Sequence, residues 1–156
     1  MRLSEALRLG EFALPPAKKM WFAFKAVTGR LCGACAVGRA VYAAGFRPAV
    51  PDVAWRIRQS TVGLVTAGLP EDAVAMTRFF DAQWPWTRRV QEGQRGFWLL
   101  NPVLHAISLR YEHLDQSLGE IANYVEQLEA QYDHDPVTSD VTPHAVDATA
   151  QLEEVQ

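Results

Sequence analysis

The chain has 156 residues, 49% of them apolar and 10% aromatic, which is enough to build the core of one compact domain. This composition excludes a wholly disordered or collagen-like protein. The formal net charge of −3 conceals an uneven distribution: residues 1–58 carry ten basic and three acidic side chains, and residues 59–156 carry five basic and fifteen acidic ones. The sequence shows neither a secretory signal nor an apolar run of membrane-spanning length, so we expect a cytoplasmic protein without a membrane partner.

Local signals predict the first elements of the chain. Ser4 is expected to cap a helix that Gly10 ends, and residues 18–25 fit a strand, an extended segment or a helical turn. The small side chains of residues 32–44 predict a central, closely enclosed helix that ends at Gly45. Tertiary packing must hold this helix, because its glycines lower the helix propensity.

The middle of the chain gives clearer helix starts than helix ends. Asp52 is expected to cap a helix, whereas residues 61–66 have the composition of a strand. A proline followed by two acidic residues predicts a helix over residues 70–83. Residues 91–96 are predicted to form a polar loop.

Two capped helices are predicted next, the first over residues 102–113 after Asn101 and the second reaching Tyr132. The second begins with the S-x-x-E capping box of Ser117 and carries an apolar face at helical spacing. Residues 133–156 contain six acids and neither Lys nor Arg, which predicts a disordered acidic tail. The predicted fold is mainly α, with about five helices in a single domain over residues 1–132 and room for a short extended segment.

Cys32 and Cys35 form a C-x-x-C motif, which fits three interpretations. A thiol at a helix start supports disulfide exchange, although the thioredoxin-like context requires a preceding strand in a βαβ unit and we expect no such alternation. A zinc site would need further ligands such as His105 and His113, whose spacing of eight residues is not that of a compact pair. The favoured interpretation is that both cysteines are small apolar residues in a packed helix, with no cofactor.

Catalytic signatures are weak throughout the chain. The carboxylate pairs Glu112/Asp115 and Glu126/Glu129 are spaced to share helix faces, and we expect these faces to be solvated. The histidines have no acid–base partner that spacing identifies. The sequence contains no hydrolase elbow, P-loop or dinucleotide-binding motif, which favours a protein that is not an enzyme.

The basic N-terminal half suggests a binding surface, because cations beside aromatic rings can contact phosphates and stack on bases. Residues 117–125 are similar to the first helix of a helix-turn-helix, but the acidic residues that follow exclude a recognition helix. The candidate interaction residues are Lys18, Lys19, Trp21, Lys25, Arg56 and Arg58.

Four short motifs run through the chain: LSEALRLG (3–10), CAVGRA (35–40), WPW (84–86) and S-x-x-EIA-x-x-VE (117–126). On these motifs the chain resembles a loose set of small, uncharacterised bacterial and phage helical proteins. The resemblance implies a helical fold and carries no activity.

The leading hypothesis is therefore a non-enzymatic accessory protein, an adaptor or assembly subunit of phage or mobile-element origin that binds a protein partner or itself. Nucleic-acid binding through the basic half is the alternative, and a metal or thiol-redox role of the C-x-x-C motif is the second alternative.

Overall fold

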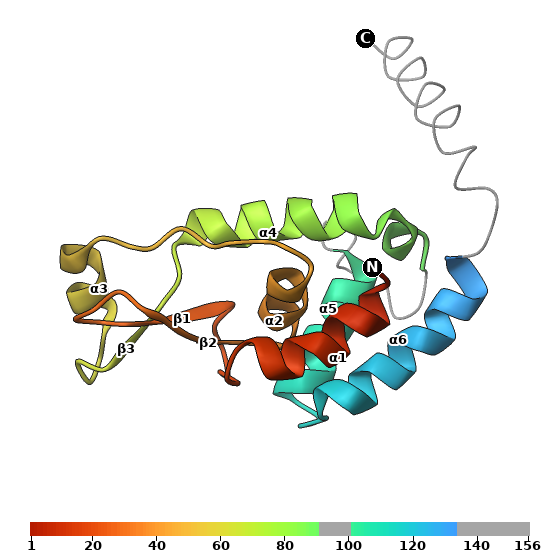
Figure 1. The fold of residues 1–156 in the computed structure, drawn as a ribbon, viewed down its shortest axis with the longest axis horizontal. Coiled ribbons are helices and arrows are strands. Elements are labelled where there is room, and N and C mark those ends of the chain that lie inside the picture. The colour runs from red at the N-terminus through yellow and green to blue at the C-terminus, as the bar shows by residue number, and fades with distance from the viewer. Residues whose placement is uncertain (91–100, 134–156) are drawn as a thin grey trace, which may run out of the picture.

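The computed structural model describes residues 1–90 and 101–133. Helices gather on one side of the molecule, and a small sheet with one short helix extends on the other (Figure 1). In the described ranges the helices are α1 (Leu3–Ala13), α2 (Ala36–Ala43), α3 (Val53–Gln59), α4 (Pro70–Gln83), the 3-10 helix η1 (Pro85–Arg89), α5 (Pro102–Glu112) and α6 (Leu118–Tyr132). The strands are β1 (Phe22–Lys25), β2 (Leu31–Ala34) and β3 (Val65–Ala67). The prediction of a mainly helical fold is confirmed, but the described part has six α-helices and a three-stranded sheet.

The sheet has the order β2-β1-β3, and both pairings are antiparallel. The sequence left open whether residues 18–25 form a strand, an extended segment or a helical turn. Residues 22–25 form a strand, the central β1. Phe22 and Phe24 are fully buried, so this strand contributes directly to the core. Phe22 stacks on Phe46 with ring centroids 5.7 Å apart, which joins the sheet to the segment after α2.

The helix predicted over residues 32–44 begins later than expected. The first of these residues pair with β1 instead, and Ala34 lies opposite Phe22 in the register. Cys35 is the N-cap of α2, and its Sγ accepts the N–H of Gly38 at 3.4 Å. The prediction failed because a backbone partner distant in sequence decides the pairing, whereas small side chains fit either conformation.

The prediction that α2 is enclosed is confirmed, and glycines allow its close contacts. A Cβ on Gly38 would lie 2.1 Å from the carbonyl oxygen of Trp21. A Cβ on Gly10 of α1 would lie 2.9 Å from the carbonyl carbon of Arg39. Only residues without a side chain allow the approach of α1 and of the chain before β1 to α2.

Ser4 was expected to cap α1, but it lies within the helix and anchors it to α6. Its N–H and its Oγ donate to the two carboxylate oxygens of Glu129 in α6, at 2.7 and 2.8 Å. The N-cap is Arg2, and α1 continues through Gly10 to Ala13. Glu129 is only 3% exposed, so the expectation that the Glu126/Glu129 face is solvated is wrong for Glu129.

The local cap signals of the last two helices are confirmed. Asn101 Oδ1 accepts the N–H groups of Val103 and Leu104 at the start of α5, and Ser117 and Glu120 form the capping box of α6. No helix in the described ranges is long and apolar enough to cross a membrane. The predicted loop at 91–96 and nearly all of the predicted tail lie outside the described residues.

Candidate functional site

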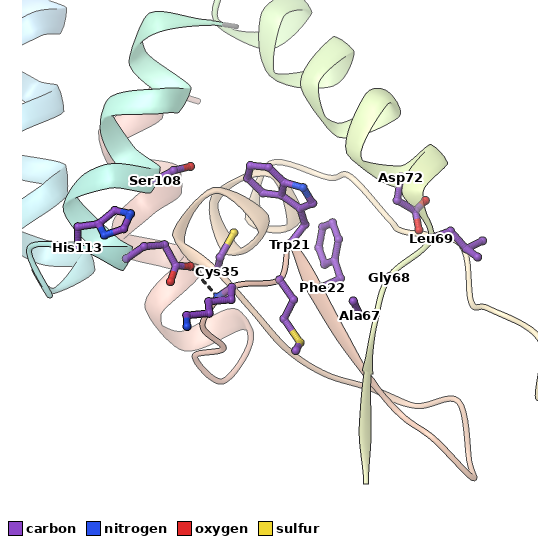
Figure 2. Close-up of a pocket in the computed structure, with 12 residues that line it drawn as sticks. Trp21, Phe22, Cys35, Ala67, Gly68, Leu69, Asp72, Ser108 and His113 are labelled. Carbon is purple, nitrogen blue, oxygen red and sulfur yellow. Dashed lines mark hydrogen bonds between the residues drawn. The ribbon is translucent and has the colours of Figure 1, made fainter. Parts of the chain in front are cut away.

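A pocket of about 580 Å³ opens between the sheet and the helices (Figure 2). Four regions form it: the segment that enters β1, the start of α2, the turn between β3 and α4, and the C-terminal half of α5. This volume is within the range of small-molecule sites. The lining residues are Lys19, Met20, Trp21, Phe22, Cys35, Ala67, Gly68, Leu69, Asp72, Ser108, Glu112 and His113.

Asp72 supplies a buried carboxylate to this pocket from the first turn of α4, where the helix dipole favours an anion. Its Oδ1 accepts the N–H of Ala49 at 3.1 Å. Its Oδ2 is buried and has no hydrogen-bond partner among the described residues, and the residue is 7% exposed. Buried polar atoms are almost always hydrogen-bonded, so this oxygen fits a donor supplied by a ligand.

Ser108 supplies a second such atom from α5. Its Oγ is buried without a hydrogen-bond partner in the part of the chain that is described. Thr77 in α4 shows the usual alternative, because its hydroxyl donates to the carbonyl of Ala73 one turn earlier, at 2.8 Å. In Figure 2, Ser108 and Asp72 lie on opposite sides of the Trp21 indole, so the pocket has a polar group on each side of an aromatic surface.

Lys19 lines the pocket in a left-handed backbone conformation, with φ = 62°. This conformation costs a residue other than glycine about 1–2 kcal/mol. The carboxylate of Glu112 holds it by accepting the Lys19 N–H at 2.9 Å, which Figure 2 marks with a dashed line. Strained backbone often accompanies functional sites, and here it sets the direction of the chain that leads into Trp21.

The structure brings together only two of the four residues considered for metal or redox chemistry. Cys35 and His113 line the pocket. Cys32 lies in β2 and donates to the carbonyl of Ala23 at 3.4 Å, and His105 lies near the N-terminus of α5, outside the lining. Within the described ranges, no group of three or more His, Cys, Asp or Glu side chains could hold a metal ion.

A strand, β2, precedes the helix that carries Cys35, but both pairings of the described sheet are antiparallel, so this strand does not belong to a parallel unit of the thioredoxin kind. The thiol itself does not have the properties of an activated one. Burial raises the pKa of Cys35 to about 11, although the N–H of Gly38 lowers it in part. A thiol with this pKa is protonated at neutral pH, and a protonated thiol is a poor nucleophile.

The six candidate interaction residues do not form one surface. Lys19 and Trp21 line the pocket, and Lys18 lies beside it. Lys18 donates to Asp115 at 2.9 Å and to the carbonyl of Tyr111, and the hydrogen bond to Asp115 raises its pKa. The Glu112/Asp115 pair therefore holds the chain before β1 rather than forming a purely solvated face.

The other three candidates belong to a different region. Lys25 ends β1, and Arg58 is exposed on α3. Arg56 is 5% exposed, which corrects its assignment as an interaction residue. Its guanidinium donates hydrogen bonds to carbonyl groups inside the fold. Nucleic-acid binding through the basic half stays a prediction.

Arg56 fastens α3 to the turn of the β1–β2 hairpin. Its Nε donates to the carbonyl of Ala26 at 2.9 Å, its Nη2 to that of Val27 at 3.4 Å, and its Nη1 to that of Pro51. Gly29 in the turn has φ = 72°, and a Cβ there would lie 2.8 Å from the Arg56 Cζ. We name α3, the hairpin turn (26–30) and residues 60–64 the α3 lobe.

The α3 lobe exposes several apolar side chains. Their exposed fractions range from 53% to 76%. Val53 and Ile57 are four residues apart on α3 and so share one side of it. The carbonyl of Leu64 accepts the Ala26 N–H at 3.1 Å, which places the segment before β3 beside the hairpin turn. The exposed residues are Val27, Val53, Ile57, Val62 and Leu64.

Sequence reasoning missed the residues that give the pocket its chemistry. Asp72 had been used only as a helix-start signal, Glu112 only as half of a carboxylate pair, and Ser108 not at all. Ser108 and Glu112 share one side of α5, but no spacing links them to Asp72 of α4 or to the segment before β1, which they meet only in the folded chain. The one available signal was the aromatic run at residues 21–24.

The chain matches no family model, no curated protein and no solved structure. The resemblance to small bacterial and phage proteins accordingly stays a prediction, and function is inferred from the pocket and the surface.

Proposed function

We propose that this chain is a non-enzymatic binding protein that takes a small organic ligand in the pocket between the sheet and α5. The observation that carries this proposal is the pair of buried polar atoms, Asp72 Oδ2 and Ser108 Oγ, that line an aromatic pocket without partners in the described residues. A ligand site has this composition: mostly apolar walls with a few placed polar groups.

The state of Cys35 supports binding rather than thiol chemistry in this pocket. Its Sγ accepts the Gly38 N–H, and its raised pKa keeps the thiol protonated. It therefore contributes to the pocket mainly as a small, weakly polar surface.

A variant that fills the pocket tests the proposal. Ala67 lines the pocket on the edge strand β3 and is exposed, so Ala67→Trp adds bulk there without disturbing the core. Ala82 is exposed on α4 outside the lining, so Ala82→Trp is the matched control. In an NMR screen with small aromatic fragments, we expect shifts in the amide signals of the lining residues, loss of these shifts in Ala67→Trp and their retention in the control. Fragments that bind Ala67→Trp equally well would refute this assignment of the site.

Protein–protein interaction is a second proposed function, and the exposed apolar residues of the α3 lobe favour it. Apolar side chains gathered on a surface often mark an interface. A photo-crosslinking residue at Ile57 should capture a specific protein in cells, and the same residue at Ala82 should not. Equal labelling at both positions would contradict an adaptor role of this lobe.

A further inference from the structure

We infer that the pocket selects ligands in which a protonated amine is attached to a flat apolar body, and that Asp72 is the residue that binds the amine. The inference rests on the proposed function, because it names the chemical class of ligand that the same pocket takes.

The first support is the state of the Asp72 carboxylate. One oxygen is used by the Ala49 N–H and the other has no donor, while three salt bridges join other residues in the described ranges and none of them includes Asp72. Gly68 lies beside this oxygen, since a Cβ there would be in ordinary van der Waals contact with Oδ2 at 3.7 Å. A carboxylate oxygen only accepts hydrogen bonds, so its partner must be a donor, and a cationic donor makes the strongest bond.

The second support is the aromatic wall beside that oxygen. Trp21 and Phe22 line the pocket, and Figure 2 shows both rings between α5 and the turn before α4. An indole face attracts a cation and also packs against a flat apolar group. Both parts of the inferred ligand therefore have a matching surface.

The third support is the charge of the remaining lining. Glu112 adds a second carboxylate, and Lys19 is the opposing cation in the lining. An anionic ligand would be placed near two carboxylates, which disfavours it. A neutral ligand could also donate a hydrogen bond to the Asp72 carboxylate, but it lacks the ion-pair attraction that a cationic donor adds.

Matched ligands on the full chain test the charge. Isothermal titration would compare tryptamine, tryptophol and indole-3-acetate, which share a ring and differ in charge, and the phenyl series of benzylamine, benzyl alcohol and benzoate. We expect the amine of each series to bind at least about 10-fold more tightly than the alcohol, and the acid to bind most weakly. Equal binding of amine and alcohol overturns the inference but leaves the proposed function standing. No binding by any of the six compounds refutes the proposed function as well.

Two variants assign the effect to Asp72. Asp72→Asn keeps an acceptor for the Ala49 N–H but removes the charge, and it should weaken tryptamine binding by about 10- to 100-fold while changing tryptophol binding less than about 3-fold. Glu71→Gln removes an exposed charge from the same helical turn outside the lining and should change neither. Equal losses in both variants would show a general electrostatic effect and overturn the assignment to Asp72. If Asp72→Asn does not fold, the amine-to-alcohol ratio of the unmodified chain still decides the inference.

Discussion

The buried guanidinium of Arg56 allows a sharp test of the α3 lobe. Arg56→Ala removes the donor to three carbonyl oxygens, those of Ala26, Val27 and Pro51. A hydrogen bond from a charged group contributes about 1.5–3 kcal/mol. The hairpin turn carries an exposed Val27, so water replaces part of what the carbonyls lose. We therefore expect a net loss of about 2–4 kcal/mol in the free energy of unfolding.

Urea unfolding followed by circular dichroism measures this loss, with Arg58→Ala as the control because Arg58 is an exposed arginine on the same helix. Hydrogen exchange locates it: the Ala26 and Gly29 amides, which bond to the carbonyls of Leu64 and Lys25, should exchange faster in Arg56→Ala. The amides of α6 should be less affected if the lobe opens separately.

The comparison of these two variants decides whether Arg56 is an anchor of the α3 lobe or an interaction residue on a binding surface. If Arg56→Ala and Arg58→Ala differ by less than about 0.5 kcal/mol, the guanidinium is not an anchor, and the earlier assignment to a binding surface regains support. Arg56→Lys should give an intermediate loss, because one ammonium has no fork to reach several carbonyls.

Three further predictions concern the packing of the core. Glu129→Gln weakens the bond that anchors α1 and should lower the free energy of unfolding by about 2 kcal/mol. The control Glu126→Gln removes a charge from an exposed ion pair and should lower it by less than about 1 kcal/mol. Similar losses for the two variants in urea unfolding would contradict the anchor. Gly38→Ala should lower the free energy of unfolding by about 3 kcal/mol through overpacking. Gly119→Ala, whose added Cβ would have its nearest contact at 3.8 Å, should raise it by about 0.5 kcal/mol. Thermal unfolding compares the two variants. Burial raises the pKa of Cys35 from 9.0 to about 11, so the unfolded chain releases its proton first and stability should fall by about 2 kcal/mol between pH 9 and pH 11. Cys35→Ala should lack this part of the pH slope, and an identical slope would contradict it.

The parts of the fold that the sequence predicted are those with local causes. The capping box of Ser117 and the cap of Asn101 act within three residues, so α5 and α6 could be located before any tertiary contact was known. The strand β2 has no such local cause. Its residues are small and fit a helix equally well, and only the pairing with Phe22 and its neighbours decides their conformation.

The same distinction explains why the candidate site was missed. Asp72 and Ser108 have ordinary local explanations, one at a helix start and the other within a helix. Their importance lies in what they lack, a hydrogen-bond partner among the described residues, and that property exists only after folding. The Ser4–Glu129 bond, between residues 125 positions apart, was likewise hidden from any reading of local spacing.

The basic charge of residues 1–58 has a structural explanation that bears on nucleic-acid binding. Arg39 donates to the carbonyls of Gly10 and Glu11 in the last turns of α1, and Arg47 donates to the carbonyl of Tyr42 in the last turn of α2. Lys18 does the same near the end of α5, and Arg56 binds the hairpin turn. Cations are favoured at helix C-termini, where carbonyl groups lack partners.

Four of the ten basic side chains in this half are therefore directed at carbonyl groups at four separate places, rather than aligned on one face. A surface that follows a nucleic-acid backbone needs several cations in one groove, and its affinity falls steeply with salt. We accordingly expect filter binding to show no strongly salt-dependent retention of DNA or RNA. Steep salt dependence that is lost in Lys25→Ala and Arg58→Ala would contradict this explanation and favour the nucleic-acid alternative.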